Sequence, residues 1–143
     1  MKLIFSGYFF KNEKEKLTFA KNVFLNKFPI SRNFIVGFHS VNEEESKKLN
    51  FDNFNKNNPT DVITLPLYNS FQEIQTLNQS NEEVISDIFI CRKIIKSNSS
   101  SYGKNLIEEM QLILIHGLLH SIGYTHDEEK ILRTIEKKIM KKI

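Results

Sequence analysis

Short runs of apolar residues, some alternating with polar ones, predict four β-strands along the chain. In the second run Phe34, Val36 and Phe38 alternate with other residues, which is typical of a strand with a buried face. The other runs are rich in Phe, Ile and Val, which suit the pleated surface of a sheet. The predicted strands span residues 2–10, 33–41, 61–67 and 84–91.

Apolar residues three or four positions apart predict helices between these strands. One helix is expected over residues 13–28, where Pro29 ends it. A long helix is expected over residues 104–122, and its second half is apolar on nearly every side, which indicates burial. A last amphipathic helix begins near Thr125, because a threonine followed three positions later by Glu128 fits a capping box.

Shorter helices and polar connections complete the predicted chain. Short helices are expected over residues 42–50 and 92–96. The Asn-rich stretch 50–60 predicts a turn or loop, the polar stretch 69–83 a mobile surface loop, and the Ser/Asn-rich stretch 97–103 a linker.

This order of elements predicts an α+β fold. We expect a small mixed sheet of about four strands packed with helices. The sequence contains no repeats and no sign of a second domain, and its 143 residues are enough for a real hydrophobic core. We therefore predict a single domain over residues 1–143.

The composition points to the cytoplasm. Cys91 is the single cysteine, which excludes an intramolecular disulfide and fits a reducing compartment. The first residues make a poor signal peptide, since Gly7 and a run of charges interrupt the apolar stretch, and no apolar run is long enough to span a membrane. The net charge of +3 permits an RNA partner without requiring one.

Three histidines near the C-terminal end carry the strongest chemical signal. His116, His120 and His126 stand at relative positions 0, 4 and 10. Residues four apart on a helix have Cβ atoms about 5–6 Å apart, so the first two imidazoles can reach one metal ion. Gly123 can end the helix and reverse the chain, which brings the third histidine back to the same ion. The sequence therefore predicts a zinc site on the long helix and the turn after it.

The same histidine spacing occurs in the metzincin proteases, but one position differs. Gly117 stands where those enzymes carry the glutamate general base. A metalloprotease is therefore the least favoured function.

The number of ligands predicts a catalytic site rather than a structural one. A structural zinc has four protein ligands, whereas a catalytic zinc keeps one position for water. Only Cys91 and His39 remain as fourth ligands, and both are better explained as ordinary core or surface residues. We therefore expect one zinc ion per chain with three histidines and a water, although imidazoles also suit nickel, copper and iron.

Carboxylates and cations near the site are harder to assign from sequence. Asp87 stands in an apolar strand, where an acid needs a partner or a task, so it is a catalytic candidate. Glu109, two turns before His116, is a weaker one. Arg92 follows the Asp87 strand, which is expected to end near the site, and is the best candidate for a phosphate contact.

Three blocks, taken in order, resemble the YbeY endoribonucleases, the rRNA-maturation factors of bacteria. The first is Leu49-Asn50 followed by Pro59-Thr60-Asp61-Val62-Ile63-Thr64. The second is Ser86-Asp87-Ile88-Phe89-Ile90-Cys91. The third is the histidine block from His116 to His126. The resemblance extends over most of the chain from about residue 33.

The resemblance implies a zinc-dependent endoribonuclease that cuts single-stranded RNA. Members of the family act in maturation of the 3′ end of 16S rRNA and in ribosome quality control, which implies the small ribosomal subunit as partner rather than DNA. His116, His120 and His126 would bind the zinc. Phe54 stands where the family often has an arginine, with Lys56 the nearest cation, and Thr125 replaces the usual aspartate.

A second hypothesis retains the zinc site but assigns it no catalytic role. Gly117 and the missing arginine fit a ribosome-assembly binding factor whose zinc is structural. That reading predicts ribosome binding without turnover and a fourth protein ligand.

Overall fold

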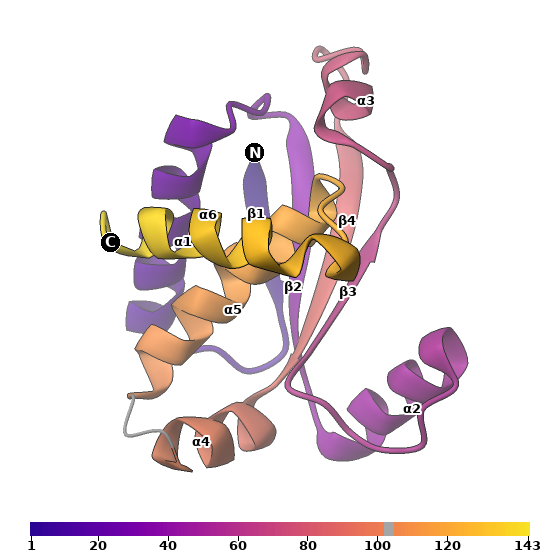
Figure 1. Ribbon diagram of the computed structural model, residues 1–143, viewed down its shortest axis with the longest axis vertical. Coiled ribbons are helices and arrows are strands. Elements are labelled where there is room, and N and C mark those ends of the chain that lie inside the picture. The colour runs from indigo at the N-terminus through magenta and orange to yellow at the C-terminus, as the bar shows by residue number, and fades with distance from the viewer. Residues whose placement is uncertain (102–104) are drawn as a thin grey trace.

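The computed structural model describes residues 1–101 and 105–143, in which helices and strands alternate (Figure 1). The strands are β1 (Lys2–Ser6), β2 (Phe34–Val41), β3 (Val62–Pro66) and β4 (Glu83–Cys91). The helices are α1 (Lys11–Lys27), α2 (Glu43–Phe54), α3 (Phe71–Gln75), α4 (Arg92–Ser101), α5 (Leu106–Ser121) and α6 (Glu129–Met140), with a 3-10 turn η1 (His126–Glu128) before α6.

The strands form one mixed sheet in the order β1-β2-β4-β3. β1, β2 and β4 run parallel, whereas β3 pairs antiparallel with β4 and forms one edge. Thr64 of β3 is the register partner of Ile88 in β4, which in turn lies beside Phe38 of β2. The predicted α+β fold with a small mixed sheet is confirmed.

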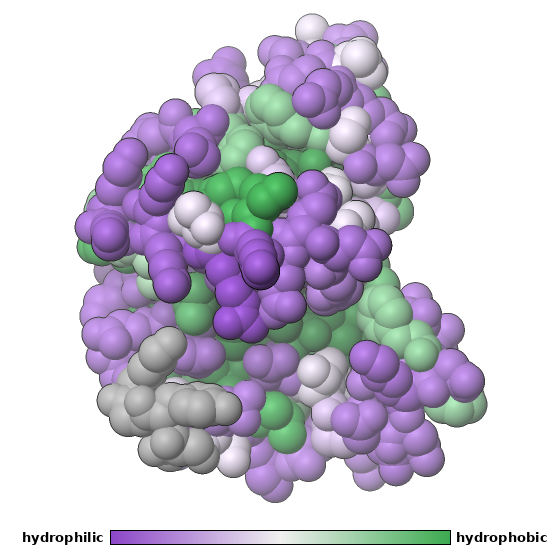
Figure 2. Space-filling model, in the orientation of Figure 1, coloured by the Kyte–Doolittle hydropathy of each residue, from purple (hydrophilic) through white to green (hydrophobic). Residues whose placement is uncertain are grey.

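Helices α1 and α5 cover one face of this sheet, and α6 packs on α5 and α1 (Figure 1). Phe34, Val36 and Phe38 point into that face and are at most 1% exposed, as their alternation predicted. On the other face the same alternation leaves Ile4 50% and Val84 39% exposed. Figure 2 shows hydrophilic residues over most of the helical surface, with apolar residues visible in the hollows between helices. The core therefore lies between the sheet and the layer formed by α1, α5 and α6.

Helix α5 is the element that positions the site. The Asn105 side chain accepts the Glu108 N–H at 2.9 Å and caps the helix N-terminus. At the other end Gly123, with φ of +106°, takes the left-handed conformation that ends the helix. Gly117 lets α5 lie close to the sheet, because a Cβ there would stand 2.8 Å from Ile88 Cδ1 and 3.2 Å from Thr64 Oγ1.

Several segments differ from the sequence prediction. Helix α2 extends to Phe54, so the first residues of the predicted loop 50–60 are helical. The polar stretch 69–83 contains α3, whose N-terminus is capped by Ser70 and whose Ile74 is fully buried, so it is not simply a loop. The predicted linker 97–103 is helical as far as Ser101, and its residues 102–103 lie outside the described part of the chain.

The first strand is shorter than predicted. It ends at Ser6 because Gly7 has a φ of +80° and turns the chain away. Within the described ranges, no helix combines the length and apolarity needed to cross a bilayer.

Candidate active site

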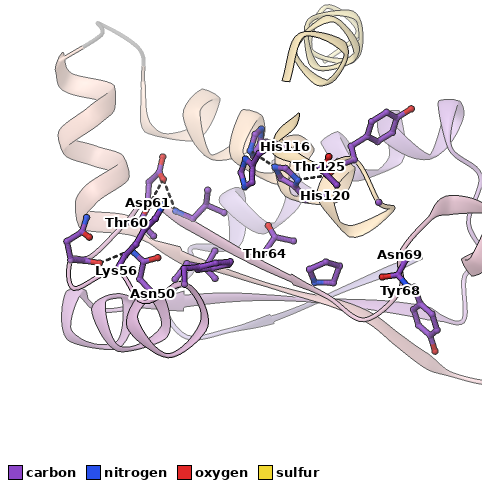
Figure 3. Close-up of a pocket in the computed structure, with 18 residues that line it drawn as sticks. Asn50, Lys56, Thr60, Asp61, Thr64, Tyr68, Asn69, His116, His120 and Thr125 are labelled. Carbon is purple, nitrogen blue, oxygen red and sulfur yellow. Dashed lines mark hydrogen bonds between the residues drawn. The ribbon is translucent and has the colours of Figure 1, made fainter. Parts of the chain in front are cut away.

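A cleft of about 580 Å³ opens between the edge strand β3 and the C-terminal half of α5 (Figure 3). All three histidines of the sequence motif line this cleft. Thr64 of β3 lies across from His116 and His120, and the segment after α2 closes one end (Figure 3). The lining mixes apolar surface from residues such as Phe54, Ile63 and Pro66 with polar side chains, among them Asn50, Lys56, Asn58, Thr60, Asp61, Asn69 and Thr125.

His116 and His120 direct the same ring nitrogen toward one point. Their Nε2 atoms lie 3.0 Å apart. Two imidazoles on a tetrahedral zinc, with Zn–N bonds of 2.0–2.1 Å, have ligand nitrogens about 3.3 Å apart. The predicted pair is therefore formed in the spacing that a shared metal ion requires.

The opposite ring nitrogens hold the two imidazoles in place. The Nδ1–H of His120 donates to the Tyr124 carbonyl at 2.6 Å, so its Nε2 keeps a free lone pair. His116 Nδ1 lies 2.5 Å from Oε1 of Glu136 on α6. Such contacts are the usual means of fixing the tautomer and orientation of metal-binding histidines.

The electrostatics of the cleft keep His120 in the form that can bind a metal. Burial lowers the pKa of His120, and the neighbouring His116 and His126 lower it further, against the opposing effect of the Tyr124 carbonyl. A lower pKa favours the neutral imidazole, which is the metal-binding form.

Glu136 is a site residue that the sequence analysis missed. It lies twenty positions after His116 and is 8% exposed. It shares the buried stripe of α6 with Leu132 and Ile139, whereas Ile131 is 54% exposed. The sequence did contain a signal for Glu136. It comes four residues after Leu132 and three before Ile139, so it lies on the buried face of the helix, where an acid needs a partner.

His126 stands beside the pair rather than within it. Its side chain is exposed on η1, and its ring centroid lies 4.6 Å from that of His120. Over residues 1–101 and 105–143, no three His, Cys, Asp or Glu side chains are already arranged as metal ligands. The capping box predicted at Thr125 is present, with Glu128 accepting the Thr125 N–H at 3.2 Å, and it fixes the turn that carries His126.

Asp87 does not lie at the histidines. Ser86 and Ile88 point toward α5, where Ser86 Oγ is 2.7 Å from Ser121 Oγ, so Asp87 between them points to the opposite face of the sheet. There its Oδ1 accepts from His39 Nε2 at 2.7 Å. Strand β4 therefore places Asp87, the catalytic candidate of the sequence analysis, on the face of the sheet opposite the histidines.

Arg92 is also directed elsewhere. β4 and α5 run in opposite directions, so the end of the Asp87 strand lies away from His120, contrary to expectation. The Arg92 guanidinium donates to both carboxylate oxygens of Glu13 at 2.8 and 2.6 Å. This hydrogen-bonded pairing lowers the pKa of Glu13. In place of the predicted phosphate contact, Arg92 forms an ion pair between the start of α4 and α1.

The two spare ligand candidates of the sequence stand outside the cleft as well. Cys91 is 1% exposed within the core, as expected of a small buried hydrophobe. His39 is held on the opposite face between Asp87 and Ser6, whose hydroxyl oxygen lies 2.5 Å from His39 Nδ1.

A helix that directs two imidazole Nε2 atoms into an open cleft is the arrangement expected of a metal-dependent hydrolase. The family model described as endoribonuclease YbeY matches residues 10–143. The chain belongs to that family.

Relatives of similar length support this assignment. An endoribonuclease YbeY of Buchnera aphidicola subsp. Acyrthosiphon pisum is 36% identical over 136 residues, which cover 91% of this chain and 81% of that protein. Another, of Syntrophomonas wolfei, is 27% identical over 146 residues, covering 92% and 94%. The solution structure of TM1509 from Thermotoga maritima has the same fold, with a TM-score of 0.62 at 23% identity, over 97% of this chain and 87% of that one.

Proposed function

We propose that this protein is a zinc-dependent endoribonuclease specific for single-stranded RNA. The observation that carries the proposal is the 3.0 Å approach of the His116 and His120 Nε2 atoms inside an open cleft. One zinc ion per chain would be held by these two nitrogens and by His126. The exposed His126 ring, whose centroid is 4.6 Å from that of His120, would complete the set by rotating about its side-chain bonds.

A zinc ion bound there supplies a Lewis acid that polarises a phosphoryl oxygen and acidifies a bound water. The chain's own residues prepare its ligands. Glu136 and the Tyr124 carbonyl occupy the Nδ1 positions of His116 and His120, so both rings present only Nε2 to the cleft. Lys56 lines the same cleft and offers a positive charge to an RNA phosphate.

The same resemblance that pointed to RNA suggests the substrate. We propose precursor 16S rRNA, cut during maturation of its 3′ end and during ribosome quality control, with the small ribosomal subunit as partner. RNA rather than DNA would be the substrate, and the cleavage would take place in the cytoplasm.

The test pairs metal content with cleavage of a single-stranded RNA. Wild-type protein is expected to hold about one zinc per chain and to cut the RNA, and His116→Ala to lose both. His39→Ala is the matched control, because it removes another histidine of the same fold from the opposite face of the sheet and is expected to keep metal and activity.

Zinc binding without RNA cleavage would favour the ribosome-assembly factor instead, and cleavage that survives verified loss of metal would end the proposal. The product termini add mechanism, since a 2′,3′-cyclic phosphate would exclude water as the nucleophile.

A further inference from the structure

A large, solvent-exposed aromatic side chain lines the cleft that contains the three histidines. Phe54 is the last residue of α2, is 49% exposed and lines the same cleft as His116 and His120. Phe51, one turn earlier on α2, is 52% exposed but does not line the cleft. Single exposed apolar residues are common, so it is the position of Phe54 in the histidine cleft, beside Lys56, rather than its exposure, that carries the argument.

The backbone around Phe54 is fixed rather than loose. The Asn50 side chain donates to the Asn58 carbonyl at 2.9 Å. The Ser46 hydroxyl donates to the Thr60 carbonyl at 2.9 Å and accepts the Thr60 N–H at 3.0 Å. These contacts tie the segment after α2 back onto the helix, so Phe54 is presented to the cleft by a rigid support.

The neighbours of Phe54 define the chemistry of a ligand. Lys56 contributes a positive charge, and the exposed Asn58 side chain offers a neutral hydrogen-bonding group (Figure 3 shows Lys56 at this end of the cleft). A flat apolar ring beside a cation and an amide suits a ligand with a flat face, a negative charge and hydrogen-bonding edges. An unpaired nucleotide has all three.

We propose that Phe54 is a stacking platform for an unpaired base of the RNA strand that enters the histidine cleft. The inference rests on the proposed endoribonuclease function and deepens it, because it assigns a residue that selects single strands. A base in a duplex is already stacked on both faces, whereas an unpaired base can take the Phe54 ring as its neighbour.

The experiment compares binding of two oligomers that share a backbone. Fluorescein-labelled 2′-O-methyl oligoadenylate is titrated with the zinc-loaded full chain, followed by anisotropy, and the same backbone with abasic units serves as second probe. A gel run after each titration checks that the probe is intact. Wild type, Phe54→Ala, Phe51→Ala and Phe54→Trp are compared.

Phe54→Ala is expected to weaken oligoadenylate binding about tenfold and to leave abasic binding unchanged, because loss of a stacking partner acts only on a base. Phe54→Trp should restore binding, and Phe51→Ala should stay within about twofold of wild type. Equal affinities of wild type and Phe54→Ala for oligoadenylate, an equal loss for both probes, or no binding by wild type would each overturn the proposal.

Cleavage assays on the same variants separate this proposal from the one it rests on. If wild type cuts RNA and Phe54→Ala cuts it with unchanged kcat/KM, stacking is wrong and the nuclease stands. If base-dependent binding requires Phe54 but no RNA is cut, stacking stands and the nuclease is wrong.

Discussion

His116 and His120 differ in what holds their outer nitrogens. The Tyr124 carbonyl that accepts from His120 belongs to the backbone just after α5 and follows from the local turn. The Glu136 carboxylate at His116 comes from a different helix and carries a full negative charge when ionised. A charged acceptor strengthens the hydrogen bond and makes the opposite nitrogen a better ligand.

We therefore expect Glu136→Gln to lower zinc affinity about tenfold, the lower end of the range for loss of such a contact. The amide can still accept the Nδ1–H of His116 but without the charge. Competition with a chelator of known affinity measures the change. Asp87→Asn is the matched control, since it alters the other histidine–carboxylate pair of the fold, and its zinc affinity should equal that of wild type. An unchanged affinity in Glu136→Gln would show that the carboxylate only supports packing.

Single residues show where sequence reasoning stops. The spacing of His116 and His120 is local, so one helix was enough to predict that they meet. Asp87 was predicted to be the acid at the site because it stands in an apolar strand. The alternation of side chains along β4, however, points it to the other face of the sheet. Which carboxylate reaches a histidine depends on how α6 crosses α5, and no local pattern encodes that crossing.

Helix α5 lies close to the sheet at Gly117. A Cβ at this position would be 2.8 Å from Cδ1 of Ile88, which is fully buried, so the Ile88 side chain would have to shift within the core. The position therefore faces the sheet rather than the cleft. The glycine that made a protease the least favoured function has a structural reason, because it allows α5 to approach Ile88 and Thr64.

Gly117→Glu is expected to lower the free energy of unfolding by at least about 3 kcal/mol and to give no peptide hydrolysis. Overpacking a core costs about 1–3 kcal/mol, and a carboxylate placed against Ile88 adds the cost of burying a charge. Urea unfolding measures the loss. Gly117→Ala is the milder companion, expected to cost about 1 kcal/mol or less because better helix propensity offsets part of the overpacking. A stable Gly117→Glu protein that cleaves peptides would contradict this account.

Elements with a clear period were predictable, and elements defined by single contacts were not. Strand β2 and helices α1, α5 and α6 were recognised from repeats of two or about three and a half residues. Helix α3 has only five residues, too few to show a period, and depends on the Ser70 cap and on Ile74 entering the core. The early end of β1 depends on the backbone angle of Gly7.

At the scale of the whole molecule, one hydrophobic core joins the sheet to α1, α5 and α6. Leu114 and Leu118 of α5, Leu17 of α1 and Leu132 of α6 all belong to it. His116 and His120 lie at the edge of this core, on a helix that is already packed on the sheet. The fold therefore does not depend on a metal ion in the way that a zinc finger does.

We expect metal-free protein to remain folded and to unfold in one cooperative transition, and zinc to raise its Tm. Ligand binding to the folded state at a free concentration of 100 times Kd contributes about 2.7 kcal/mol, which corresponds to roughly 8–12 °C for a chain of this size. Calorimetry with and without a chelator measures both quantities, and His116→Ala should show no zinc-dependent shift. If chelation instead unfolds the protein, the metal is structural. That result would support the hypothesis of a ribosome-assembly factor, which the metal-independent packing of the core argues against.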